Sequence, residues 1–198
     1  MASLYAIVGS MERARLMLAA RAPYLQLRFK DQPLTPHREE ISHWKTRFPE
    51  TRVVINDDLE AAMELGVWGA HLGQQDLDHY PLKTVREASV AVGISTHSQD
   101  EIQRALEYRP ALLGFGPIFP TVSKQMSHPP HGVEALRSVV MRVSLPIAAI
   151  GGIESENVTA VAATGVAMVA MISYLDRFTE PEEISILASR MDRFSPHR

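Results

Sequence analysis

The chain has 198 residues, a net charge of −3, a hydrophobic content of 45% and no cysteine. This length and composition predict one compact globular domain over residues 1–198. They exclude a disulfide, a thiolate metal ligand and a cysteine nucleophile, and the negative net charge argues against a nucleic-acid partner.

Membrane insertion is not expected either. No apolar run reaches the roughly 18–20 residues that would span a bilayer, and the longest, LPIAAIGGI, is interrupted by Gly151 and Gly152. The N-terminal residues show no basic segment followed by an apolar stretch, which argues against a signal peptide. We therefore expect a cytoplasmic protein, with which the lack of cysteine is compatible.

Short apolar runs alternate with helical patterns along the chain. We expect strands at residues 4–8, 24–29, 52–55, 68–72, 89–95, 111–116, 146–152 and 166–173. We expect helices at residues 11–20, 36–44, 57–65, 81–88, 98–108, 133–143, 155–165 and 181–194. The strands are apolar on both faces, which is typical of a parallel sheet covered by helices. Eight strand–helix units predict a single (β/α)8 TIM barrel, with a doubly wound open sheet as the alternative fold.

Polar and glycine residues gather where the expected strands end. In barrels of this kind the active site lies at the carboxyl ends of the strands, so these residues are candidates for one site. In chain order they are Gln26, Arg28, Lys30, Asn56, Asp57, Gln74, Asp76, Ser95, His97, Thr121, Ser123, Lys124, Gly151, Gly152, Ile172 and Ser173.

Several of these residues have a structural interpretation when taken alone. Asp57 is typical of a helix start, Asp76 of a turn, and His97 of a capping or packing role. His71 is expected to point into the barrel wall as a buried core histidine. Their gathering at one rim favours a shared function over these separate explanations.

The rim residues also sort by chemistry. Arg28, Lys30 and Lys124 supply positive charge, and Asp57 and Asp76 supply hard oxygen ligands suited to Mg²⁺ held together with substrate phosphates. Glycines near the seventh and eighth strands expose backbone N–H groups, the usual phosphate site of such barrels. This arrangement predicts a pyrophosphate subsite and a monophosphate subsite. The reaction expected there is departure of pyrophosphate, assisted by the metal and the cations.

Seven segments in order resemble the thiamine phosphate synthase family: QLRFK, VIND, HLGQQDL, GISTH, GFGPIFPTVSK, IAAIGGI and AMIS. The resemblance extends from Leu4 to about Ser173. It implies a transferase that joins hydroxymethylpyrimidine pyrophosphate to hydroxyethylthiazole phosphate and releases pyrophosphate. It also implies a dissociative mechanism, Mg²⁺ as cofactor and small-molecule substrates as partners. The sequence gives no oligomeric state, and a homo-oligomer is compatible with it.

The resemblance assigns roles by position. It implies that Asp57 and Asp76 bind Mg²⁺ and that Gln26 lies by the pyrimidine. It implies that the pyrophosphate is bound by Arg28, Lys30, Asn56, Ser95 and Lys124. It implies that the thiazole phosphate is bound by Thr121, Ser123, Gly151, Gly152, Ile172 and Ser173. Arg28, Lys30, Ser95 and Lys124 are the residues expected to act in catalysis.

The chain departs from the family pattern at Phe29 and Gln75, where an acid is common, and at Gly9-Ser10 after the first strand. Two alternatives stay open. A thiazole tautomerase shares the fold, but it commonly has a histidine where this chain has Pro117 and lacks the acid at Asp76. A non-catalytic barrel that binds thiazole phosphate is the other.

Overall fold

The computed structural model describes residues 2–29, 33–121 and 129–193. Within these residues eight parallel strands form a closed barrel in chain order, and β8 pairs back onto β1. The strands are β1 (Ser3–Val8), β2 (Tyr24–Leu27), β3 (Arg52–Asn56), β4 (Gly69–Leu72), β5 (Ala91–Thr96), β6 (Leu112–Phe115), β7 (Ile147–Ile150) and β8 (Met168–Met171). The predicted (β/α)8 barrel is confirmed, and closure excludes the open doubly wound sheet.

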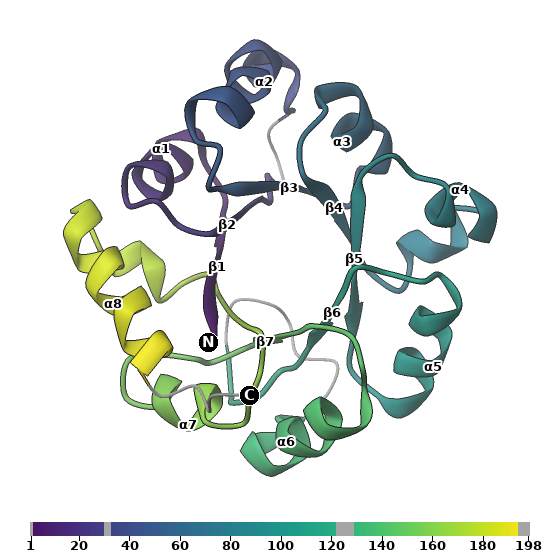
Figure 1. The fold of residues 1–198 in the computed structure, drawn as a ribbon, viewed down its shortest axis with the longest axis vertical. Helices are drawn as coiled ribbons and strands as arrows, with labels where there is room; N and C mark the ends of the chain where they lie inside the picture. Colours follow the sequence, from purple (N-terminus) through teal and green to yellow (C-terminus); the bar gives the residue numbers. More distant parts are fainter. Residues whose placement is uncertain (1, 30–32, 122–128, 194–198) are drawn as a thin grey trace.

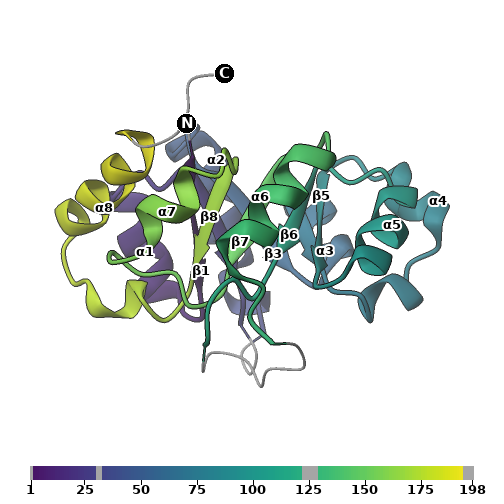
Figure 2. The ribbon, with the colours of Figure 1, turned by 90° about the horizontal axis from the view of Figure 1, so that it is seen from below.

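Helices surround the barrel, as Figure 1 shows from one end and Figure 2 from the side. They are α1 (Met11–Ala19), α2 (Arg38–Arg47), α3 (Leu59–Leu65), α4 (Leu82–Arg86), α5 (Gln99–Glu107), α6 (Gly132–Arg142), α7 (Val158–Ala162) and α8 (Pro181–Arg193). Short 3-10 turns lie at Thr35–His37, Asp76–Asp78 and Leu175–Arg177. No helix in the described part of the chain is long and apolar enough to cross a membrane.

Local sequence explains where several helices begin and end. Ser10, Asp58 and Ser98 are the N-caps of α1, α3 and α5, and each side chain accepts a backbone N–H from the first turn. Helix α3 ends at Gly66, whose φ of 60° is readily adopted only by glycine. Short polar caps and a terminal glycine therefore set these boundaries.

Strand alternation divides the apolar residues into two groups. Leu4, Ala6 and Val8 of β1 belong to the large cluster between the barrel and the helices. Tyr5 and Ile7, which alternate with them, belong to a smaller cluster inside the barrel. Inward-facing side chains near the carboxyl ends of the strands therefore face the barrel mouth.

Some predicted boundaries were wrong. The fifth strand was expected at 89–95 but runs from Ala91 to Thr96, and the seventh helix was expected at 155–165 but spans Val158–Ala162. Asp57 was expected within the third helix, yet α3 begins at Leu59 with Asp58 as its cap. Asp57 therefore belongs to the loop after β3, one residue before the cap.

Candidate active site

The carboxyl ends of β2 and β3 bring three predicted site residues together. Gln26 is 3% exposed, and its Nε2 donates to Asn56 Oδ1 over 2.5 Å. The Oε1 of Gln26 is buried and accepts no hydrogen bond from the described residues. Arg28 follows β2 directly, and its charge acts on Asp57. Gln26 therefore offers one unused polar atom beside an amide–amide pair.

Asp57 and Asp76 reach the barrel mouth from neighbouring loops. Asp57 has a φ of 62°, a left-handed conformation that Asp tolerates better than most residues. Its amide N–H donates to the His71 carbonyl over 2.8 Å, which ties the loop to β4. Asp76 Oδ2 accepts the Gly73 N–H over 2.6 Å. The backbone of Asp57 and the carboxylate of Asp76 are thus each held by a backbone contact.

The Asp76 carboxylate and the Asn56 amide both act on the ionisation of Asp57. Partial removal from water raises the pKa of Asp57 to about 6, and the neighbouring Asp76 charge adds to the rise, whereas Arg28 and Asn56 oppose it. The two neighbouring acids concentrate negative charge at the barrel mouth, and a bound cation would neutralise part of it.

His71 and Gln74 meet Ser95 across the next strand pair. His71 Nε2 lies 2.9 Å from Ser95 Oγ, and Gln74 Nε2 donates to the Ser95 carbonyl over 2.7 Å. His71 Nδ1 is buried and has no hydrogen-bond partner among the described residues. Burial lowers the pKa of His71 to about 4, so the imidazole is neutral near pH 7.

The expectation for His71 was therefore only partly right. The histidine is half-buried, and its ring lies in the barrel interior, with its centroid 6.4 Å from that of the Tyr5 ring, rather than in the wall. It is also not fully satisfied, because one ring nitrogen lacks a partner.

The loops after β7 and β8 carry the remaining glycines and Ser173. Gly152 has a φ of 63°, and a Cβ there would lie 2.4 Å from the Pro120 carbonyl oxygen. Only glycine therefore allows the loop after β6 to approach so closely. The amide N–H of Gly152 donates to no other group in the described part of the chain. It is available to an anion.

Gly151 is held by the same loop. Its φ is 101°, and a Cβ there would lie 2.7 Å from Pro117 Cα, while its carbonyl accepts the Phe119 N–H over 3.0 Å. Ile172 and Ser173 follow β8, where the carbonyl of Ser173 accepts the Asp176 N–H over 3.2 Å. Gly151, Gly152, Ile172 and Ser173 thus end adjacent strands, as predicted.

Part of the predicted site lies on the loop after β6. Thr121 is described and half-buried. Ser123 and Lys124 lie outside the described residues, as does Lys30 after β2. Their proximity to the rim therefore remains a prediction from the sequence.

Several supporting residues were missed by sequence reasoning. Asn157 Nδ2 donates to the Gly152 carbonyl over 2.9 Å and braces that loop. The Arg13 guanidinium donates to the carbonyls of Phe178 and Leu175, which fastens the loop after β8 to α1. Glu101, by contrast, follows the α5 cap Ser98 by three residues in a recognisable capping box, and it accepts the His97 N–H over 2.6 Å. Arg13 lies 165 residues from Phe178 in sequence, so no local pattern could have revealed this contact.

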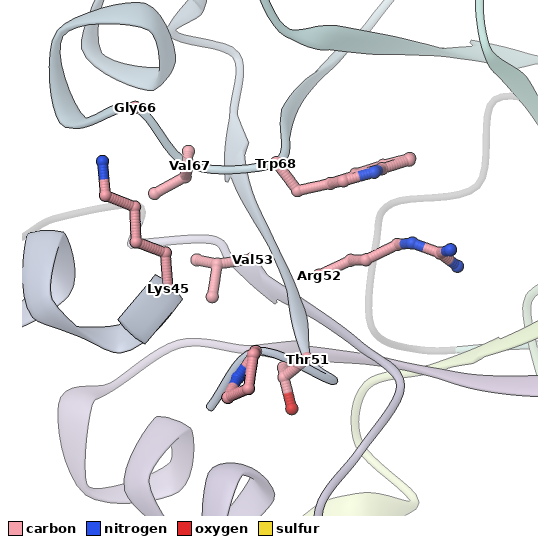
Figure 3. Close-up of a pocket in the computed structure, with 8 residues that line it drawn as sticks. Lys45, Thr51, Arg52, Val53, Gly66, Val67 and Trp68 are labelled. Atoms are coloured by element: carbon pink, nitrogen blue, oxygen red, sulfur yellow. The ribbon is translucent and has the colours of Figure 1, made fainter. Parts of the chain in front are cut away.

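A separate cavity of about 270 Å³ lies at the opposite, amino-terminal end of the barrel. Its lining includes Lys45, Thr51, Arg52 and Trp68. Figure 3 shows that Lys45 and Arg52 extend in different directions, so their charges do not converge on one point. This cavity contains none of the rim residues and is not part of the candidate active site.

Comparisons with known proteins agree with this geometry. Residues 4–175 match the thiamine monophosphate synthase family. The chain is 37% identical to the thiamine-phosphate synthase of Neisseria meningitidis serogroup A, over 91% of this chain and 89% of that protein. It is 39% identical to the thiamine-phosphate synthase of Photorhabdus laumondii, over 88% of this chain and 82% of that protein.

A solved structure shows the same similarity. The thiamine phosphate pyrophosphorylase from Pyrococcus furiosus superposes with a TM-score of 0.82 and 26% identity, covering 97% of this chain and 96% of that one. Sequence and structure agree over nearly the whole chain, and the chain therefore belongs to the thiamine monophosphate synthase family.

Proposed function

We propose that this protein is a transferase that joins hydroxymethylpyrimidine pyrophosphate to hydroxyethylthiazole phosphate, giving thiamine phosphate and pyrophosphate. The observation that carries the proposal is the pair Asp57 and Asp76, whose charges interact and on which the Arg28 charge acts, at the carboxyl end of a barrel from this family. Both substrates are anionic small molecules, which suits a rim of cations and exposed backbone N–H groups.

The two carboxylates fit Mg²⁺ as the cofactor. Their oxygens are the hard ligands that this ion prefers, and Mg²⁺ usually takes one or two carboxylates and completes its shell with water and substrate phosphates. The pKa of Asp57 is raised to about 6, first by partial removal from water and then by the Asp76 charge, and a bound cation would oppose both effects. Among the described residues no cluster of three or more His, Cys, Asp or Glu side chains could hold a metal alone. When bound, the ion would neutralise negative charge on the pyrophosphate.

Cationic side chains of the protein balance the remaining negative charge of the pyrophosphate. Arg28 stands beside the acidic pair, and we assign Lys30 and Lys124 to the same group from the sequence. The bond from the pyrimidine methylene carbon to oxygen breaks, and its electron pair leaves with the pyrophosphate. Fixed positive charges stabilise the leaving group as this charge develops. The Ser95 hydroxyl can add a hydrogen bond to it.

Orientation of the two rings completes the reaction. We assign Gln26, through its unused Oε1, to the pyrimidine of the first substrate, and its hydrogen-bond partner Asn56 to the pyrophosphate. Gly152, with its free N–H, belongs with Gly151, Ile172 and Ser173 at the thiazole phosphate, where Thr121 and Ser123 contribute from the loop after β6. The thiazole nitrogen then donates its lone pair to the pyrimidine carbon and forms the new C–N bond.

A direct assay tests the proposal. The purified protein is mixed with both precursors and Mg²⁺, and thiamine phosphate and pyrophosphate are measured together over time. We expect equal amounts of the two products. Asp76→Asn should lower turnover by about 100-fold or more at limiting Mg²⁺, because one metal ligand loses its charge. Wild-type turnover in that variant would contradict the metal assignment.

A matched control separates loss of a ligand from loss of any acid. Asp58→Asn removes a charge next to Asp57, and asparagine remains a good N-cap for α3, so this variant should keep normal turnover. Thiazole phosphate binding without any product would favour a non-catalytic barrel. Tautomerisation of a thiazole carboxylate phosphate would favour the tautomerase.

We also propose that the enzyme works in the cytoplasm, because its charged substrates do not cross membranes unaided. Whether it is a homo-oligomer is decided by light scattering on the purified protein.

A further inference from the structure

The Ser95 side chain has one hydrogen-bond partner among the described residues, the His71 ring inside the barrel. His71 Nε2 is 2.9 Å from Ser95 Oγ, while the Ser95 backbone carbonyl is held by Gln74 Nε2 at 2.7 Å. Strand register makes the contact, because His71 pairs with Gly93 and Ser95 with Gly114 on the neighbouring strands. The backbone of Ser95 is therefore fixed, and His71 decides how its hydroxyl points.

Two features of the His71 surroundings decide which nitrogen carries the proton. A neutral imidazole has one N–H and one lone pair. Nδ1 is buried without a partner among the described residues, and it is packed so tightly that a Cβ on Gly93 would lie 2.6 Å from it. A buried N–H without an acceptor is rarer in proteins than an under-used acceptor. The proton therefore belongs on Nε2.

We infer that His71 is a positioning residue that donates from Nε2 to Ser95 Oγ and so leaves the Ser95 hydroxyl hydrogen free to donate to the pyrophosphate of the substrate. This inference rests on the proposed function, since it needs an anion at the rim. A hydroxyl has one hydrogen. If Nε2 accepted it instead, Ser95 would meet the anion only with oxygen lone pairs, which would repel it.

The role of His71 is separable from its structural role in the backbone. Its carbonyl accepts the Asp57 N–H over 2.8 Å, and this contact does not depend on the imidazole. Substitution of the side chain thus leaves the loop of the proposed metal ligand attached to β4. An effect of the ring should reach the reaction through Ser95 alone.

A first experiment measures the tautomer without substrate. In protein labelled with ¹⁵N at histidine, the nitrogen chemical shifts of His71 distinguish Nε2–H from Nδ1–H at pH 7. His71→Gln identifies the signal by its loss. We expect Nε2–H. The Nδ1–H tautomer would overturn the inference whether or not the protein turns over its substrates.

A second experiment is a double-mutant cycle with Ser95→Ala. His71→Leu removes the donor and should lower kcat/KM for the pyrimidine pyrophosphate about ten-fold, the effect of one well-placed hydrogen bond. His71→Gln keeps an N–H donor in reach of Ser95 and should stay within about three-fold of the wild type. In the Ser95→Ala background His71→Leu should cost nothing further. The KM for thiazole phosphate should not change in any variant.

Each outcome of the cycle decides a different point. Additive losses in the double variant, or a folded His71→Gln as impaired as His71→Leu, would show that His71 does not act through Ser95. Circular dichroism and thermal unfolding confirm that each variant is folded. A wild-type protein that makes no thiamine phosphate would contradict the proposed function, and the tautomer measurement would then decide the His71–Ser95 arrangement by itself.

Discussion

The two ends of the barrel use arginine in opposite ways. At the amino-terminal end Arg52 donates to the Tyr24 hydroxyl over 2.6 Å. Its guanidinium also lies 5.0 Å from the Tyr24 ring centroid and 5.7 Å from that of Trp68. At the carboxyl-terminal end the Arg28 side chain makes no hydrogen bond within the described part of the chain, although its charge acts on Asp57. One charge is committed to the fold, and the other is left for a ligand.

Two amide side chains of the carboxyl-terminal end follow the same pattern as Arg28. Gln26 and Gln74 each keep one buried side-chain oxygen without a partner among the described residues. Unsatisfied buried polar atoms cost stability, so their concentration in and around one barrel mouth is expected where a ligand completes the hydrogen bonding. The comparison teaches that this end is preorganised for binding at the expense of stability.

The test with the largest expected effect replaces each of the two arginines by methionine, in two separate variants. Arg28→Met should lower kcat/KM for the pyrimidine pyrophosphate about 100- to 1,000-fold, because a charge that stabilises the leaving group is lost, and should barely change the thermal unfolding midpoint. Arg52→Met should keep wild-type turnover and destabilise the fold by about 1 to 2 kcal/mol through the lost hydrogen bond and ring contacts. Steady-state kinetics and thermal unfolding of both variants check this. Similar kinetic losses in both would remove the distinction between the two ends.

Sequence patterns predicted the barrel well because its signals are local. Apolar runs marked all eight strands, and caps such as Ser98 marked helix starts. Predicted strand ends were less accurate where the expected strand continues beyond the hydrogen-bonded pairing, as at residues 89–90 before β5. The pairing stops where the neighbouring strands end, and the sequence of one strand does not contain that information.

The candidate site was predictable only as a set of strand ends. Because the ends of parallel strands meet at one rim, Gln26, Asn56 and Asp57 were placed together correctly in advance. The His71–Ser95 contact was not, because it depends on the register between β4 and β5 and on which way each side chain faces. Contacts from distant helices, such as Arg13 to Phe178, depend on packing and carry no local signal.

A second test compares two glycines with nearly the same backbone conformation at opposite ends. Gly66 has a φ of 60° and Gly152 a φ of 63°. At Gly66 an added Cβ would meet only the flexible end of Lys45, at 3.0 Å, whereas at Gly152 it would meet the Pro120 carbonyl oxygen at 2.4 Å. Gly66→Ala should therefore cost about 1 kcal/mol for the left-handed backbone.

Gly152→Ala should cost about 2 to 3 kcal/mol, because overpacking against backbone adds to the same conformational cost. It should also raise the KM for thiazole phosphate and leave that for the pyrimidine pyrophosphate unchanged. Urea unfolding and two-substrate kinetics measure both effects. An equal loss of stability in the two variants, with unchanged KM values, would show that Gly152 is an ordinary turn residue.

The smallest expected effect concerns pH and the acidic pair itself. The pKa of Asp57 is about 6 in the folded protein against an ordinary value of 3.8. The folded state therefore holds this proton more tightly than the unfolded chain does. The stabilisation that this provides at low pH is lost as the pH rises through about 6. In metal-free buffer Asp57→Asn should be more stable than the wild type at pH 7 by less than about 1 kcal/mol, since the Asp57 carboxyl is only partly removed from water and its charge is largely screened by solvent.

This gain should shrink as the pH falls toward 4, because the wild-type carboxyl is then protonated as well. Urea unfolding at pH 4.5, 5.5 and 7 measures it, and Asp58→Asn controls for the general loss of one charge. Excess Mg²⁺ at pH 7 should reverse the order of stabilities, because a bound ion stabilises the folded wild type more than the variant with a weakened site. A gain that is the same at every pH, with or without Mg²⁺, would mean that the negative charge at this end of the barrel is not arranged for a cation.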